Sequence, residues 1–327
     1  MVAVIGAAGT IGTKVCEFLA SWDEPVARLD SRLEGAEHVD IRDASGLVGS
    51  LDAADVCVNC ADYRLNIEVM EAALEAGCHY LDLGGLFHMT RRQLWLDESF
   101  RKAGLSAILG MGSAPGKTNL LVRAAVERLV EEPEALEIWA AARDPAAAGH
   151  PLPAPYSVQT LLDELQMQPV VLTGGDLKEV EPLSGKAARD FPEPIGRAEG
   201  IYTLHSELAT LPASFPSLQE ASFRLSLPEG LVEKLLELGG GELPEPYVQS
   251  EQAVAVHLVE VRGEGRVVTG MTVTRGGSAR STAEPAARAA VELASGRLSA
   301  LGVHAPEAAI PKPEAFLGSL DTDVIWL

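Results

Sequence analysis

Short apolar runs alternate with segments of helical periodicity along the first third of the chain. Residues 2–5 form an unbroken apolar run, the pattern of a parallel strand that is buried on both faces. Residues 10–21 then carry apolar side chains at helical spacing. Further strands are predicted from apolar runs at residues 26–29, 38–41, 56–60, 80–83 and 106–109. Six strands interleaved with helices predict an α/β domain with a doubly wound parallel sheet over residues 1–116.

Two of the intervening helices are followed by glycine. Residues 66–76 precede Gly77, and residues 91–103 precede Gly104. Glycine readily adopts the left-handed conformation that commonly terminates a helix, so we expect both helices to end there.

The pattern changes after Gly116. A helix over residues 118–130 precedes an apolar run at 136–142 and then a loop rich in proline, alanine and glycine. Strands with alternating polarity follow at residues 169–172, 222–227, 253–261 and 265–274, and an apolar strand is predicted at 201–204. Alternation with hairpin turns predicts a mixed sheet, and therefore a second α/β domain over residues 117–278. The alanine-rich run 286–294 predicts a helical tail over 279–327.

Composition narrows the classes of partner. The 327 residues are enough for two domains, and 47 Asp and Glu against 26 Lys and Arg give a formal net charge of −21. So acidic a surface repels nucleic acid and anionic membranes, and we expect neither as a partner. The first strand starts at the N-terminus without a charged targeting segment, so we expect a soluble, cytoplasmic protein.

The four cysteines are too few for a disulfide scaffold of this size. Cys57 and Cys60 have the spacing of a redox or metal motif, but they fall in a predicted strand. Positions three apart in a strand face opposite sides of the sheet, which disfavours a dithiol. No metal site is predicted.

A glycine-rich turn joins the first strand to the first helix. Gly6 permits the tight turn, Gly9 permits close approach of a pyrophosphate, and Gly12 permits close packing of helix and strand. The backbone of Ala8, Thr10 and Ile11 would face the phosphates at the helix N-terminus. The turn in this context predicts a Rossmann-type site for a nicotinamide dinucleotide; the alternative is a turn that binds no ligand.

The end of the second strand carries two opposed signals. Asp30 favours NAD, because a carboxylate binds ribose hydroxyls and repels a 2′-phosphate, whereas Arg32 favours NADP. On balance the sequence favours NAD slightly. Ser31, which lies between Asp30 and Arg32, is also expected to contact the cofactor. The strand-end positions expected to contact the rest of the cofactor are Asp40, Ile41, Asn59, Cys60, Ala61, Asp62 and Gly84.

Six short motifs resemble the saccharopine dehydrogenase-like family. They lie at residues 58–63, 73–82, 110–119, 180–184, 205–211 and 302–307. Within the family, Ala114-Pro115-Gly116 is most similar to the lysine 6-dehydrogenase branch, because the saccharopine reductase and carboxynorspermidine dehydrogenase branches more often have Asp at the first position. The resemblance implies hydride transfer between a nicotinamide and a carbon bonded to nitrogen in an amine or amino acid. It also implies a homodimer, built through the second domain, and C-terminal helices that return to the Rossmann domain.

Such chemistry needs an acid–base group, and histidine has a suitable ordinary pKa. His205 and Glu207 follow a predicted strand in a region that the resemblance places at the substrate, although Glu207 could be a first-turn carboxylate and His205 a surface histidine. His88 follows another strand end on the nicotinamide side. Candidate substrate-binding residues are Tyr63, Arg64, Lys117, Tyr156 and Ser157.

Other classes of protein remain as alternatives. Active short-chain reductases need a lysine four residues after a tyrosine, and none of the five tyrosines has one. A semialdehyde dehydrogenase would need an activated cysteine, and nothing in the sequence activates Cys60. A dinucleotide-binding sensor or assembly protein without turnover stays open.

Overall fold

The computed structural model describes residues 1–238 and 247–327, and they form two compact units. Unit 1 comprises Met1–Gly116 and Thr282–Lys312. Unit 2 comprises Lys117–Ser281 and Pro313–Leu327. The first change of unit falls at Gly116, where the hydrophobic pattern changes along the sequence.

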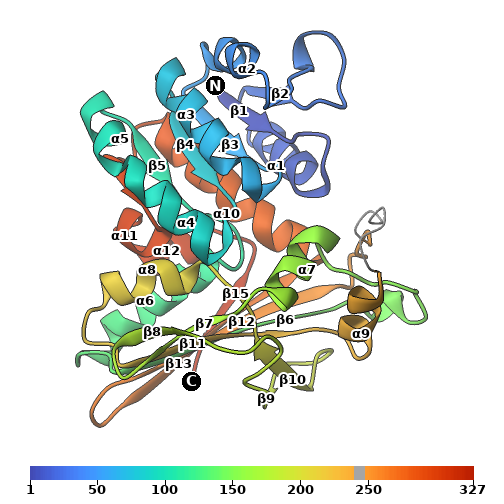
Figure 1. The fold of residues 1–327 in the computed structure, drawn as a ribbon, viewed down its shortest axis with the longest axis vertical. Coiled ribbons are helices and arrows are strands. Elements are labelled where there is room, and N and C mark those ends of the chain that lie inside the picture. The colour runs from blue at the N-terminus through green and yellow to red at the C-terminus, as the bar shows by residue number, and fades with distance from the viewer. Residues whose placement is uncertain (239–246) are drawn as a thin grey trace. The chain divides into compact units, whose positions relative to one another are not determined.

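Unit 1 is built on a six-stranded parallel sheet with strand order β14-β5-β4-β3-β1-β2 (Figure 1). Its strands are β1 (Val2–Ile5), β2 (Val26–Leu29), β3 (Val56–Asn59), β4 (His79–Asp82), β5 (Ser106–Ile108) and β14 (Gly302–His304). The helices are α1 (Thr10–Ser21), α2 (Ala44–Leu51), α3 (Asn66–Ala76), α4 (Leu86–Gln93), α5 (Asp97–Ala103) and α11 (Pro306–Ala309). Strand order that reverses beside β1 is the arrangement of a doubly wound dinucleotide-binding domain, so the predicted fold class is confirmed.

The sixth strand is not the one that the sequence predicted. Residues 38–41 form no strand: the chain passes through a short 3-10 helix (Gly35–Glu37), and only one isolated bridge, Asp30 to His38, follows. The sheet is completed instead by β14, three residues from the C-terminal part of the chain that pair with β5. A three-residue strand has too little pattern to be detected without its partner.

The helix ends of unit 1 follow the glycine signals. Gly77 and Gly104 both adopt the left-handed conformation, with φ of 75° and 71°, and both predicted helix ends are confirmed. The helix expected over residues 91–103 is divided in the structure into α4, a 3-10 turn (Leu94–Leu96) and α5, and α4 already begins at Leu86. Apolar side chains from β1, β3, β4, α3 and α5 form the core beneath these helices.

Unit 2 is built on a nine-stranded mixed sheet (Figure 1). Its strands are β6 (Ala135–Arg143), β7 (Val170–Thr173), β8 (Asp176–Glu179), β9 (Ala187–Asp190), β10 (Arg197–Tyr202), β11 (Glu220–Ser226), β12 (Val254–Arg262), β13 (Val267–Arg275) and β15 (Asp323–Trp326). Parallel β6 and β11 lie beside the antiparallel pair β12 and β13, so the predicted hairpin and mixed sheet are confirmed. The helices of unit 2 are α6 (Lys117–Leu129), α7 (Val158–Gln166), α8 (Glu207–Ser214), α9 (Leu231–Glu237) and α12 (Pro313–Leu317). Helix α10 (Gly277–Ala294) begins in unit 2 and belongs to unit 1 from Thr282 onward.

The C-terminal tail divides between the units instead of forming only helices against unit 1. Residues 282–312 belong to unit 1, whereas residues 313–327 belong to unit 2 and end in β15, which pairs with β13. Trp326 lies over Gly270, where a Cβ would come within 2.6 Å of the indole, and Arg128 stacks on the same ring at 4.3 Å. The absence of a side chain at Gly270 therefore lets the last strand pack on the sheet.

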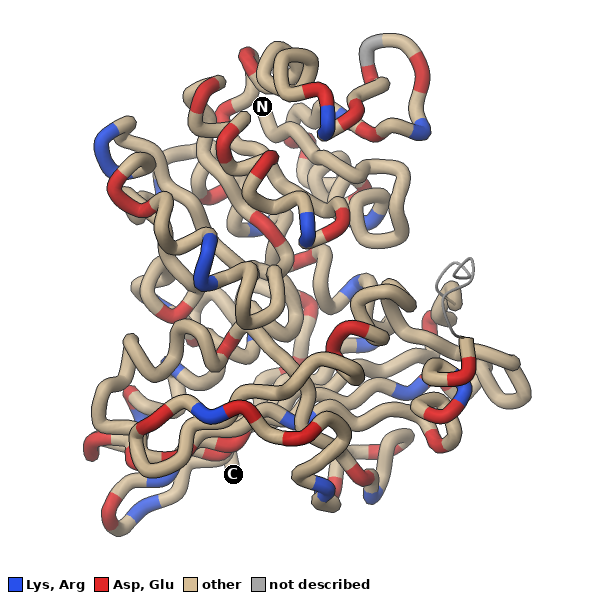
Figure 2. Tube along the Cα trace, viewed as in Figure 1, with Lys and Arg blue, Asp and Glu red and all other residues tan. Residues whose placement is uncertain are grey.

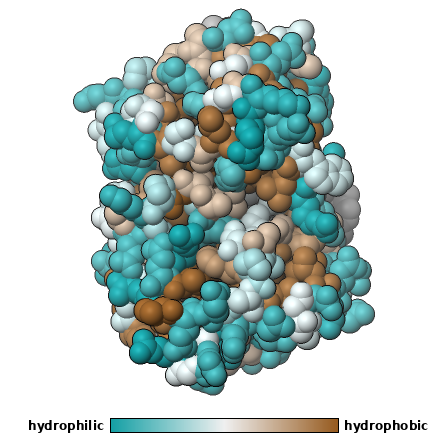
Figure 3. Space-filling view, turned by 90° about the vertical axis from the view of Figure 1, so that its left-hand side faces the viewer, coloured by the Kyte–Doolittle hydropathy of each residue, from teal (hydrophilic) through white to brown (hydrophobic). Residues whose placement is uncertain are grey.

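Acidic residues are spread over both units, with basic residues interspersed (Figure 2). On the face shown in Figure 3, hydrophilic side chains surround smaller apolar areas. Within residues 1–238 and 247–327, no helix has the length and hydropathy that crossing a membrane requires.

Candidate functional site

The turn between β1 and α1 fits only glycine at two of its three glycine positions. A Cβ on Gly6, whose φ is +76°, would lie 2.8 Å from the Ala61 nitrogen, and a Cβ on Gly12 would lie 2.1 Å from the Gly6 oxygen. Gly9 is the N-cap of α1 and offers no side-chain cap to the first-turn amides. Those amides and the helix dipole form a cradle for an anion, as a pyrophosphate requires.

Asp30 and Arg32 lie beside this turn as one hydrogen-bonded unit. Asp30 Oδ2 accepts from the Ala8 N–H at 3.0 Å, while Oδ1 accepts from Arg32 N at 2.9 Å and from Nε at 3.1 Å. The Asp30 side chain is 6% exposed and the Arg32 side chain 55%. Burial raises the pKa of Asp30, but these hydrogen bonds outweigh it and hold the pKa below its usual value. The ionised Asp30 is thus directed at the protein, and the guanidinium is the charge that faces solvent.

Arg32 also reaches the phosphate-binding turn itself. A Cβ built on Gly9 would lie 3.5 Å from Arg32 Nη2. Ser31 and Asp40 are exposed nearby and Ile41 is half-buried, so these predicted cofactor positions surround the same strand end.

A buried carboxylate organises the loops after β4 and β5. Asp82 is 1% exposed, and its Oδ1 accepts from the backbone N–H of Gly84 at 2.9 Å and of Gly110 at 2.6 Å. Its Oδ2 accepts from Gln93 at 2.5 Å and from the Tyr80 hydroxyl at 3.0 Å. Burial raises the pKa of Asp82, and these donors offset only part of the rise.

The same network extends to the loop after β3. Asn66 donates to Asp82 Oδ2 at 3.2 Å and accepts from Asn59, which in turn accepts from the Ala61 N–H at 3.1 Å. Since Ala61 also lies against Gly6, one set of buried side chains fixes the glycine turn and three strand-end loops. This is the edge of the sheet at which doubly wound domains bind their ligands.

The sequence analysis found Asn59, Cys60, Ala61 and Gly84 but gave no role to Asp82, Asn66 or Gln93. The available signal was an acid at the end of an apolar strand. Asp62, which was also predicted there, accepts a hydrogen bond from the backbone N–H of Arg64 at 3.0 Å.

The four cysteines are free, so Cys57 and Cys60 form no disulfide. In the described ranges, no group of three or more His, Cys, Asp or Glu side chains is arranged to hold a metal.

Unit 2 contains a second polar cluster, centred on His205. Nδ1 of His205 lies 3.3 Å from Glu207 Oε2, and Nε2 lies 3.7 Å from Glu164 Oε2. Tyr156 donates to Glu164 at 2.6 Å, Thr118 donates to Glu207 at 2.7 Å, and the imidazole stacks on Phe223 at 3.6 Å. Three predicted residues, His205, Glu207 and Tyr156, are therefore brought together. Glu164 was missed; its signal was a carboxylate on the apolar face of a helix rich in leucine.

The charge of His205 differs from the expectation of a base that titrates near neutral pH. Burial alone lowers the pKa of His205, but the carboxylates of Glu164 and Glu207 together outweigh it and raise the pKa to about 10. The imidazole is accordingly protonated at neutral pH, and it is buried, not a surface histidine.

We expect the free energy of unfolding to decrease at alkaline pH, where this histidine loses its proton. Its pKa is about 10 in the folded chain and about 6.5 in the unfolded chain, so its contribution is complete below pH 6.5 and is lost as pH rises through 10. Urea unfolding at a series of pH values should show this loss, on the order of a few kcal/mol. In His205→Gln the added slope between pH 7 and 10 should disappear; an unchanged slope would contradict the assignment.

The remaining predicted site residues have other contacts. His88 is exposed and contacts the edge of Phe87, and Arg64 is exposed, pairs with Asp62 and lies over the Tyr63 ring. Lys117 is 1% exposed, and its Nζ donates to Thr274 and Ser281 at 2.6 Å, so its charge is used inside unit 2. Ser157 is the N-cap of α7 and accepts from Thr160 N.

Comparison with known proteins identifies a relative of the N-terminal domain. Residues 2–108 match the model of the saccharopine dehydrogenase NADP binding domain. The resemblance found in the sequence is confirmed, and the family match together with the glycine cradle assigns a nicotinamide dinucleotide to unit 1.

Two curated relatives are carboxyaminopropylagmatine dehydrogenase of Synechocystis and carboxynorspermidine synthase of Vibrio cholerae. The first is 26% identical over 63% of this chain and 54% of that protein. The second is 24% identical over 56% of this chain and 46% of that protein. The chain thus spans about half the length of the curated relatives it matches.

Solved structures share the fold over nearly the whole chain. Apo saccharopine dehydrogenase (L-Glu forming) of Saccharomyces cerevisiae has a TM-score of 0.71 and 13% identity, covering 100% of this chain and 99% of that chain. A meso-dapdh mutant of Clostridium tetani, crystallised with DAP, has a TM-score of 0.51 and 15% identity, covering 97% and 95%. At these identities the likeness shows the fold alone.

Proposed function

We propose that the protein is an NADP-dependent oxidoreductase that acts on a C–N bond of an amine or amino acid. The observation that carries the proposal is the family match of residues 2–108, with a glycine turn shaped for a pyrophosphate. The names of the relatives, a dehydrogenase and a synthase of carboxylated polyamines, support amine or imine substrates. Among candidate substrates, we place L-lysine and related ω-amino acids first, because of the Ala114-Pro115-Gly116 pattern.

The nicotinamide supplies or accepts a hydride at the carbon, and a proton must be moved at the nitrogen. In the reductive direction, imine, hydride and proton combine to an amine; the oxidative direction reverses each transfer. His205 is protonated at neutral pH between Glu164 and Glu207, which suits a donor of the proton. We therefore propose that the chain near pH 7 is in the protonation state that imine reduction requires.

The choice of NADP over NAD rests on the Asp30–Arg32 pair. The sequence favoured NAD on the assumption that Asp30 accepts from ribose hydroxyls. In the structure both Asp30 oxygens accept hydrogen bonds from the protein, and the exposed Arg32 guanidinium lies beside the glycine turn. A guanidinium binds a phosphate through charge-assisted hydrogen bonds, so the 2′-phosphate of NADP is the better partner.

Arg32→Ala is expected to weaken NADPH binding by about tenfold or more, with NADH binding little changed, because it removes charge-assisted hydrogen bonds to a phosphate. Arg42→Ala is the matched control, since Arg42 is also exposed in unit 1 but takes no part in the Asp30 network. Titrating NADPH and NADH into each variant gives the ratio of the two affinities. An unchanged ratio in Arg32→Ala would contradict the proposed preference.

Turnover tests the function as a whole. The purified chain is assayed with NADP and NAD against a panel of ω-amino acids and polyamines. It is then assayed with NADPH and NADH against mixtures of amines with keto acids, following the absorbance of the reduced nicotinamide. We expect turnover with at least one carboxylated amine or its imine. Tight cofactor binding without turnover on the whole panel would instead support the dinucleotide-binding sensor.

A further inference from the structure

The polar cluster around His205 is buried except for one member. Tyr156 is half-buried, and it joins the cluster through its hydroxyl, which donates to Glu164 Oε2 at 2.6 Å. The other polar members are each 5% exposed or less: Thr118, Glu164, His205 and Glu207. Tyr156 is therefore the member of the cluster through which a proton most readily reaches solvent.

The two ring nitrogens of His205 are held differently. Nδ1 lies 3.3 Å from a carboxylate oxygen of Glu207, and Glu207 in turn accepts from the Thr118 hydroxyl at 2.7 Å. A carboxylate at Nδ1 fixes the orientation of an imidazole, and this side of the ring ends in the core. Nε2 is buried and forms no hydrogen bond with the residues that the structure describes. Nε2 is thus the nitrogen left to exchange its proton.

One oxygen of Glu164 faces both Tyr156 and His205. Glu164 Oε2 accepts from the Tyr156 hydroxyl and lies 3.7 Å from Nε2 of His205. An N–H···O hydrogen bond spans about 2.7–3.2 Å, so a movement of about 1 Å is enough to close this gap. When the gap is closed, a continuous chain of hydrogen bonds leads from Nε2 to the Tyr156 hydroxyl.

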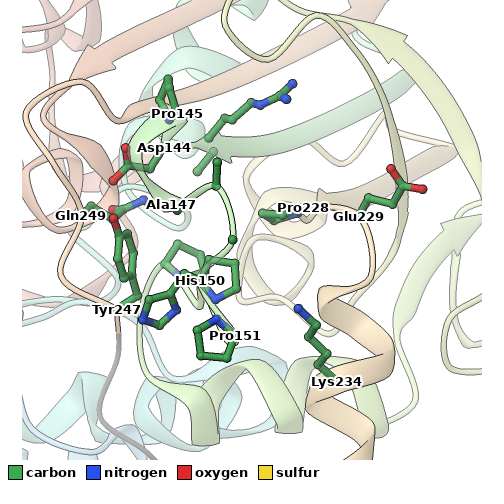
Figure 4. A pocket seen from close by; sticks show the side chains of 16 residues that line it. Asp144, Pro145, Ala147, His150, Pro151, Pro228, Glu229, Lys234, Tyr247 and Gln249 are labelled. Atoms are coloured by element: carbon green, nitrogen blue, oxygen red, sulfur yellow. The ribbon is translucent and has the colours of Figure 1, made fainter.

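A braced loop carries Tyr156. At its start, Asp144 accepts from Ser250 N at 2.6 Å, and further along the His150 ring packs against the Tyr247 ring, with centroids 4.7 Å apart. Figure 4 shows this loop at a pocket of about 350 Å3, whose lining does not include Tyr156. Four residues of the loop are prolines, whose φ is fixed by the ring: Pro145, Pro151, Pro153 and Pro155. The loop is therefore stiff where it positions the Tyr156 hydroxyl beside Glu164.

The transferable proton of the cluster resides on His205. Burial, together with the charges of Lys117 and His205, lowers the pKa of His257 well below its ordinary value, so His257 is neutral. Burial and the charge of Glu164 raise the pKa of Tyr156 well above its ordinary value. The Tyr156 hydroxyl accordingly stays protonated, and it gives up its proton only as it receives another.

We propose that Tyr156, Glu164 and His205 form a proton relay, in which the imidazolium stores the proton and the Tyr156 hydroxyl delivers it. In imine reduction, the hydroxyl gives its proton to the substrate nitrogen and takes one from Glu164, which takes one from Nε2. The imidazolium becomes a neutral imidazole, and Glu164 and Tyr156 return to their starting states. Water restores the proton of His205 along the same route. The relay deepens the proposed function, on which it rests for the identity of the proton acceptor.

Hydrogen exchange at His205, followed by NMR in the full chain without cofactor, tests the relay. The Nε2–H signal of isotope-labelled histidine is assigned by its absence in His205→Gln. Tyr156→Phe should leave His205 protonated at neutral pH but slow exchange of Nε2–H with solvent by about tenfold or more, because the route loses its outer member. A tyrosine that only supported the fold would give the opposite result, since a loosened cluster exchanges faster.

Tyr202→Phe is the matched control for this substitution. Tyr202 is also a half-buried tyrosine of unit 2, but its hydroxyl accepts from Arg224 Nη2 at 2.9 Å and takes no part in the relay. Exchange at Nε2 of His205 should be the same in Tyr202→Phe as in the unmodified chain.

A second pair of variants decides the question if Tyr156→Phe does not fold. Glu164→Gln and Glu207→Gln each remove one carboxylate beside His205 and so lower its pKa, but only Glu164→Gln interrupts the relay. The two are compared at a pH at which His205 is protonated in both. Exchange at Nε2 should be slower by about tenfold or more in Glu164→Gln than in Glu207→Gln.

Exchange that is unchanged or faster in Tyr156→Phe, or equal in the two glutamine variants, would overturn the relay. Because this measurement needs neither cofactor nor turnover, the relay can be found even if the proposed oxidoreductase activity is absent. If turnover is found, Tyr156→Phe should lower kcat by about tenfold or more and leave the affinity for NADPH unchanged, whereas Tyr202→Phe should change neither. An unchanged kcat in Tyr156→Phe would mean that the proton reaches the substrate by another route.

Discussion

Gly12→Ala is expected to abolish dinucleotide binding. The added Cβ would lie 2.1 Å from the Gly6 oxygen and 2.8 Å from the Gly6 carbonyl carbon, and both are backbone atoms that cannot rotate away. Either α1 or the turn must move, and the first-turn amides of α1 then lose their place beneath the pyrophosphate. We expect NADPH affinity to fall by about 100-fold or more, and overpacking to cost about 1–3 kcal/mol of stability.

Gly49→Ala is the control for this substitution. Gly49 lies inside α2, and a Cβ there would meet no atom within 4 Å. That variant should bind NADPH normally, and its free energy of unfolding should rise by up to about 1 kcal/mol, since alanine is the better helix former. Fluorescence titration of NADPH and urea unfolding give both quantities. Normal NADPH affinity in Gly12→Ala would mean that the turn does not hold the cofactor.

The second large effect is expected from Asp82→Asn. The amide keeps the shape of the side chain but offers one acceptor oxygen where the carboxylate offers two. Asp82 receives donors on both oxygens, among them the N–H groups of Gly84 and Gly110, so some of these buried donors must lose their partner. Each unsatisfied buried donor costs about 1–3 kcal/mol, and we expect a total loss on the order of 3–5 kcal/mol.

The loops after β4 and β5 should loosen together in this variant. Hydrogen exchange should therefore accelerate at Gly84 and Gly110 more than in the core of the sheet. Asp43→Asn is the matched control, because Asp43 is an exposed N-cap of α2 and asparagine caps a helix equally well; its stability should not change. If Asp82→Asn unfolds at the same urea concentration as the unmodified chain, the network does not have the role described.

Local signals in the sequence were sufficient for much of the fold. The glycine turn, the helix ends at Gly77 and Gly104, and the hairpin of β12 and β13 each depend on neighbouring residues, and the structure agrees with all of them. The failures involve partners distant in the chain. β14 is a strand only because β5 lies beside it, and β15 only because β13 does.

The functional sites show the same difference between features set by neighbouring residues and features set by residues distant in the chain. Asp30 and Arg32 are two residues apart and were both found, but which of them faces the ligand depends on Ala8, 22 residues away from Asp30. His205 was found as a candidate base, yet its charge is set by Glu164, far along the chain and hidden in an apolar helix face. Asp82 was passed over because its role exists only through donors from three other segments.

The most direct test of the account is the fate of the hydride. The chain is incubated with NADPH deuterated at the transferring position of the nicotinamide, together with lysine and a panel of keto acids, and the products are analysed by mass spectrometry. The account predicts an amine product with one deuterium on a carbon bonded to nitrogen, and loss of this product in Gly12→Ala. Deuterium retained in a cofactor that binds tightly, with no labelled amine from any substrate pair, would contradict it.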